Sequence, residues 1–62
     1  MEFNVSTLGN QEQAQELEKT ILTSEPNADI NIDLNALKVT INSEASSETF
    51  EQLIVASGHK VS

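Results

Sequence analysis

The 62-residue sequence contains no cysteine. A domain of this size buries only about 60% of the surface that its unfolded chain exposes, so many small domains add disulfide bonds or a structural metal. Without cysteine, the chain cannot be a disulfide scaffold, a zinc ribbon or a thiol redox enzyme. We therefore expect a single domain over residues 1–62, held together by its hydrophobic core.

Basic residues are scarce as well. The three cationic side chains, Lys19, Lys38 and Lys60, stand against ten Asp and Glu residues, and the formal net charge at pH 7 is −7. Binding to nucleic acid or to an anionic membrane surface requires clustered Lys and Arg. We expect neither as a partner.

Long apolar runs are also missing. No run approaches the roughly 18 residues that a membrane-spanning helix needs. The first residues alternate between polar and apolar, whereas a secretory signal has a basic start and an apolar core. We therefore expect a cytoplasmic protein with no direct membrane insertion within these residues.

Hydrophobic residues make up 37% of the chain, and their spacing predicts three strands. Apolar and polar residues alternate over residues 1–7, 28–34 and 37–42, which is typical of strands with one buried face. Asn35 and Ala36 form a predicted turn between the second and third of these segments. Because two alternating segments lie so close together, we expect them to form a hairpin.

Two further segments have apolar residues at helical spacing: residues 11–24, and a segment that follows Ser46 or Ser47 and runs to about residue 57. Asn10 suits the N-cap of the first, and Gln13 follows at the spacing of a capping box. Ser46 or Ser47 can cap the second. We expect Pro26 to end the first helix and Gly58 to end the second.

The predicted order is therefore βαββα with a short final strand at residues 59–61. Every element is apolar on one side only, so two helices must cover one face of an antiparallel sheet. Right-handed crossovers then favour an α+β fold, the ferredoxin-like βαββαβ two-layer sandwich. The predicted core residues are Phe3, Val5, Ala14, Leu17, Ile21, Ile30, Ile32, Val39, Ile41, Phe50, Leu53 and Ile54.

Four stretches resemble a known family: the loop Thr7-Leu8-Gly9, the strands Ile30–Leu34 and Lys38–Ile41, and the closing segment Ala56–Val61. Over nearly its whole length, the chain resembles the heavy-metal-associated domain. This is the small ferredoxin-like module of bacterial, notably cyanobacterial, copper chaperones and of the N-terminal regions of metal-transporting P-type ATPases. The closing segment is the most specific part of the resemblance.

The chain departs from this family at the metal loop. The family carries a Cys-x-x-Cys pair before the first helix, where two thiolates hold Cu(I) or zinc. Asn10 and Gln13 occupy the corresponding positions, and neither has a soft ligand atom. The resemblance therefore implies a degenerate metal loop, in which these two residues cap a helix.

His59 is the only histidine. In related chaperones a histidine at this place lies beside the metal loop and can add a ligand, so the resemblance implies that His59 lies near Leu8 and Asn10. A lone imidazole binds transition metals weakly, because affinity needs several converging donors. Two interpretations stay open: a half-exposed histidine with no metal, or a weak copper or zinc ligand.

Two acidic patterns are predicted to be ordinary surface. The spacing Asp29-x-Asn31-x-Asp33 matches the opening of a calcium loop, but the glycine that should follow is replaced by Leu34. Glu12 and Glu16 stand one helical turn apart, as a catalytic pair might. A domain this small has no room for the enclosed pocket that such a pair needs.

Two functions follow from the resemblance, and neither is an enzyme. In the first, the domain has lost its thiolate site and keeps the docking surface of the family, formed by Leu8, Gly9, Asn10 and His59. It would act as a protein-interaction or regulatory module in metal trafficking, binding no cofactor. Its partner would be a related chaperone or P-type ATPase domain with a basic face. In the second, it still handles metal through His59 and oxygen donors, or through a site shared with a second chain.

Overall fold

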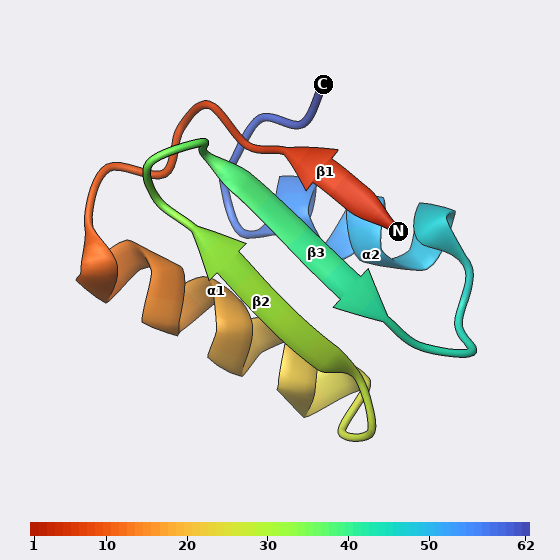
Figure 1. Ribbon diagram of the computed structural model, residues 1–62. Helices are drawn as coiled ribbons and strands as arrows, with labels where there is room; N and C mark the ends of the chain where they lie inside the picture. Colours follow the sequence, from red (N-terminus) through yellow and green to blue (C-terminus); the bar gives the residue numbers. More distant parts are fainter.

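The computed structural model describes residues 1–62 and contains two helices and a three-stranded antiparallel sheet (Figure 1). The strands are β1 (Glu2–Asn4), β2 (Asp29–Asp33) and β3 (Lys38–Asn42), and the helices are α1 (Gln11–Ser24) and α2 (Ser47–Ala56). β3 lies in the centre of the order β1-β3-β2, and both helices lie on one face of the sheet. The predicted ferredoxin-like α+β sandwich is confirmed.

The core lies between the sheet and the helices. Val39 in the central strand is paired with Phe3 on one side and with Ile32 on the other. The buried residues are Phe3, Val5, Leu8, Ala14, Leu17, Ile21, Val39, Ile41, Phe50 and Ile54. All but Leu8 belong to the predicted core.

Three predicted core residues are only half-buried: Ile30, Ile32 and Leu53. Ile30 and Ile32 belong to β2, which has a neighbour on one side only. They pack against the core from the edge of the sheet. An edge strand is covered less completely than a central one, which explains their remaining exposure.

The predicted final strand does not form as a regular element, since residues 59–62 have no helical or strand assignment. The chain nevertheless returns to β1 (Figure 1). Asn4 N donates to Ser62 O at 3.4 Å, and Ser62 N donates to Asn4 O at 2.9 Å. The last residues thus lie where the fourth strand of a βαββαβ order belongs, but they are too few to extend the ladder.

The end of α2 brings the C-terminal segment back toward the first loop. Gly58 has a φ of 92°, which is in the left-handed region that glycine adopts without steric cost. Gly58 N donates to Val55 O at 2.9 Å, and His59 N donates to Ile54 O at 3.3 Å. This pair of bonds is the Schellman motif. It ends α2 and sets the position of His59.

Neither α1 nor α2 is long and apolar enough to cross a membrane.

Candidate functional site

Asn10 is the N-cap of α1, as predicted. Its backbone is extended, with φ −163° and ψ 176°, and its side-chain Oδ1 accepts a hydrogen bond from Gln13 N at 2.9 Å. Asn10 O accepts the first helical bond, from Ala14 N at 3.2 Å. An N-cap of this kind contributes about 1 kcal/mol relative to alanine.

Gln13 also accepts a backbone hydrogen bond, although not from the residue that a capping box predicts. In a capping box its side chain would accept from the N-cap residue's own N–H. Here Gln13 Oε1 accepts from Gly9 N at 2.6 Å, one residue earlier. The amide oxygens of Asn10 and Gln13 are thus both hydrogen-bonded to backbone N–H groups around the start of α1.

His59 is held by a residue that the sequence reasoning did not single out. Its Nδ1 lies 2.8 Å from the Thr7 hydroxyl, and the same Oγ1 accepts from Lys60 N at 3.0 Å. In the neutral ring with its proton on Nε2, Nδ1 accepts the Thr7 O–H. In the protonated ring, Nδ1–H donates to the remaining lone pair of Oγ1. The contact is compatible with both charge states, and Nε2 stays free of it.

Thr7 therefore joins the β1–α1 loop to the segment after α2. The expected proximity of His59 to this loop is realised through Thr7, which directly precedes Leu8. The signal that could have pointed to Thr7 is its place in the Thr-Leu-Gly stretch that carries the family resemblance.

Leu8 requires a correction. The resemblance implies a place for Leu8 on the docking surface, but only 4% of the residue's surface is accessible and it packs in the core cluster. A large apolar side chain gains about 1.5–3 kcal/mol by such burial, so the loop turns it inward. Gly9 and Asn10 are exposed, and His59 is half-buried.

The structure brings no set of three or more His, Cys, Asp or Glu side chains together in an arrangement that could hold a metal ion. Asp33 belongs to the calcium-like spacing, but its Oδ1 accepts from Asn35 N at 2.9 Å and from Ala36 N at 3.2 Å, which stabilises the turn after β2. Glu12 is exposed in the first turn of α1. Glu16 lines an open groove between the helices, together with His59.

No protein-family model and no curated protein sequence matches the chain. Solved structures do match. The copper chaperone Atx1 from Synechocystis PCC6803, in a trimeric Cu1 form of a His61Tyr mutant, superposes with a TM-score of 0.95 at 26% identity, covering 100% of this chain and 98% of that one. A second match is the solution structure of a cyanobacterial copper metallochaperone, ScAtx1, with a TM-score of 0.82 at 27% identity, covering 100% and 97%.

A third similar structure is described as a gold binding protein. It superposes with a TM-score of 0.94 at 24% identity and covers 98% of this chain and 94% of that one, a likeness that bears on the fold alone. The similarity to the Atx1 structures agrees with the resemblance derived from Thr7–Gly9 and Ala56–Val61. The chain therefore has the fold of the heavy-metal-associated domain, as found in Atx1-type copper chaperones, and it lacks the cysteine pair of that family.

Proposed function

We propose that this chain is a heavy-metal-associated-type domain that has lost its thiolate site and acts in metal trafficking as a protein-interaction or regulatory module, without enzymatic activity and in the cytoplasm. The observation that carries the proposal is the hydrogen bonding of Asn10 and Gln13. Each side-chain oxygen accepts a backbone N–H, at 2.9 Å and 2.6 Å.

These bonds supply a physical reason for the loss of the metal. Cu(I) prefers soft sulfur ligands, and a neutral amide oxygen is a hard, weak substitute. An oxygen that turned toward a metal would also give up its hydrogen bond to a backbone N–H, and the Asn10 cap alone contributes about 1 kcal/mol. Helix capping and metal binding therefore compete for the same two side chains, and the observed hydrogen bonds favour capping.

The docking surface of this module consists of Gly9, Asn10 and His59, supported by the buried Leu8. Thr7 fixes His59 against the loop, so the surface is organised before a partner arrives, which lowers the entropic cost of binding. The net charge of −7 favours a partner with a basic face. By similarity to the copper chaperones, this partner is a related chaperone or a P-type ATPase domain.

A second candidate function, metal handling through His59, is favoured by one observation. Thr7 occupies Nδ1, so Nε2 remains available to an ion. Because the chain offers no converging set of ligands, such a site would need donors from a second chain. Copper or zinc would then be cargo shared between two molecules.

Calorimetric titration with Cu(I), Zn(II) and Cu(II) tests the proposed loss of the site. We expect no Cu(I) binding in competition with a chelator. In the double variant Asn10→Cys/Gln13→Cys, the restored thiolates should bind Cu(I) several orders of magnitude more tightly. The variant gives up the Asn cap, at about 1 kcal/mol of stability, so circular dichroism should accompany the titration as a folding control.

Submicromolar Cu(I) affinity of the unmodified chain would overturn the proposal. Binding of Zn(II) or Cu(II) that is abolished by His59→Ala and doubles the molecular mass in sedimentation would establish the second candidate instead.

The docking role is tested by NMR titration of the ¹⁵N-labelled chain with a heavy-metal-associated domain of positive net charge. The amides of Gly9, Asn10 and His59 should shift, and the affinity should fall as salt is raised. A matched domain of negative net charge is the control. Equal binding of both domains, or shifts confined to the sheet face, would contradict the proposed surface.

A further inference from the structure

An open groove of about 320 Å³ lies between the middle of α1 and the C-terminal end of α2. Its apolar lining is provided by Leu17, Leu53 and Ala56, and its polar lining by Glu16, Thr20, Ser57 and His59. His59 also belongs to the docking surface defined above. The groove is therefore continuous with that surface and extends it along the helices.

Two sources of negative potential meet at this groove. The first is Glu16, an exposed residue without an ion-pair partner, since the only salt bridge joins Lys38 to Glu2 at 3.5 Å. The second is the C-terminal end of α2. It carries the negative pole of the helix dipole, and its last turn contains no basic residue.

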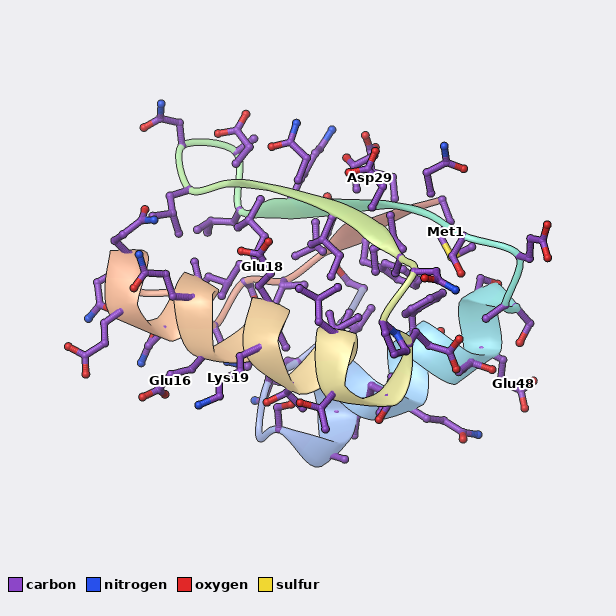
Figure 2. All side chains as sticks on the ribbon, turned by 90° about the horizontal axis from the view of Figure 1, so that it is seen from below. Met1, Glu16, Glu18, Lys19, Asp29 and Glu48 are labelled. Atoms are coloured by element: carbon purple, nitrogen blue, oxygen red, sulfur yellow. The ribbon has the colours of Figure 1, made fainter.

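None of the three lysines lines the groove, and none forms an ion pair with Glu16. Lys19 projects, like Glu16, from the side of α1 that is turned away from the sheet (Figure 2), but it does not line the groove. The side chains of Leu17, Leu53 and Ala56 give the groove an apolar strip. It favours a cation that carries an aliphatic stem.

We infer that the groove receives an arginine side chain of a basic protein partner. The methylene stem would lie on Leu53 and Ala56, and the guanidinium would donate to the Glu16 carboxylate near the end of α2. Arginine fits better than lysine because its planar fork can donate two parallel hydrogen bonds to one carboxylate. A bound metal ion fits less well, because Glu16 and His59 have no third ligand beside them.

This inference rests on the proposed function and specifies how the basic partner is recognised. The first test uses a small probe, N-acetyl-arginine amide, added to the ¹⁵N-labelled chain. The amides of Glu16, Ala56 and Ser57 should shift in a saturable manner. N-acetyl-citrulline amide, which has nearly the same shape and no charge, should leave them unchanged.

Two pairs of variants identify the contacts. Glu16→Gln should weaken arginine binding about fivefold, whereas Glu51→Gln makes the same change in net charge outside the groove and should have little effect. Ala56→Leu should fill the groove and abolish binding. Val55→Leu enlarges a neighbouring residue that is 55% exposed and does not line the groove, so it should bind normally.

Equal weakening by Glu16→Gln and Glu51→Gln would overturn the inference, because the attraction would then come from net charge alone. A second groove, lined by Glu25, Asp29 and Glu44 among others, serves as an acidic control, and equal shifts there would overturn the inference as well. The same variants separate it from the proposed function. If a basic heavy-metal-associated domain still binds Ala56→Leu with unchanged affinity, the docking role stands and the groove has no part in it.

Discussion

At the scale of single residues, Thr7 has a structural role that belongs to no secondary-structure element. One hydroxyl contacts both the His59 ring and the Lys60 backbone N–H, 52 and 53 residues away in sequence. The loop before α1 and the segment after α2 are thereby fixed to each other. The proposed docking surface draws on both segments, so it depends on this contact.

Replacing Thr7 by valine removes the hydroxyl and keeps the β-branched shape. We expect a loss of about 1 kcal/mol in the free energy of unfolding, because Lys60 N and His59 Nδ1 lose a partner at a half-exposed site. Urea denaturation measures the loss, and the ¹⁵N resonances of the His59 ring report the freed Nδ1. Thr7→Ser restores the hydroxyl and should recover most of both effects. Unchanged ring resonances in Thr7→Val would show that the contact is absent in solution.

At the same scale, the sequence predicts Asn10 well and Thr7 not at all. An N-cap acts on N–H groups two or three residues away, so its pattern is visible in a short window. The partners of Thr7 lie at the other end of the chain, and no local pattern reveals them. Leu8 was misplaced for a related reason: a single apolar residue in a loop has no periodicity to tell whether it points inward.

At the scale of elements, the boundaries of both helices follow from local chemistry. Asn10 and Ser46 are the N-caps, α1 ends just before Pro26, and Gly58 ends α2. Each of these residues acts through its own backbone or a short side chain. The sequence therefore predicted α1 over residues 11–24 correctly and placed the end of α2 within one residue.

Gly58 provides a test at this scale. Its φ of 92° is unfavourable for any residue with a Cβ, while a Cβ added there would meet no atom within 4 Å. Gly58→Ala should therefore cost only the backbone strain, about 1–2 kcal/mol. Gly58→Asn should cost less, because asparagine tolerates positive φ. Equal stability of the alanine variant and the unmodified chain in thermal unfolding would contradict the strained end that we describe.

The hairpin shows where a pattern misleads. Leu37, Val39 and Ile41 alternate with polar residues, which predicts a strand from residue 37. In the structure Leu37 lies in the turn with a φ of 55°, and β3 begins at Lys38. Asp33 accepts the N–H groups of Asn35 and Ala36 and tightens the turn. Alternation alone cannot distinguish the last residue of a turn from the first of a strand.

At the scale of the whole molecule, the charge is unbalanced. Ten acidic residues and three basic ones share a small surface, and only one salt bridge forms. Bringing like charges together in the folded state lowers its stability by self-repulsion. The same negative charge attracts a basic partner. The excess of acidic residues therefore lowers the stability of the fold and favours the proposed function.

Salt should therefore stabilise the protein. Raising the ionic strength from about 0.01 to about 0.15 M shortens the screening length from about 30 to about 8 Å. Screening that contributes about 1 kcal/mol would raise Tm by about 4–8 °C in a domain of this size. Thermal unfolding by circular dichroism measures the shift. Glu51→Lys reduces the imbalance and should show a smaller shift, whereas a Tm that falls with added salt would refute the argument.

The sequence alone determined the order of the elements, the helix caps, most of the core and the absence of thiolates, because each depends on the spacing of residues along a short stretch or on composition. The tertiary structure decided what those elements bring together. It placed Leu8 inside, left β2 at the edge of the sheet, seated His59 against Thr7 and opened the groove beside Glu16. Such contacts join residues distant in sequence, and only the packing of the helices against the sheet creates them.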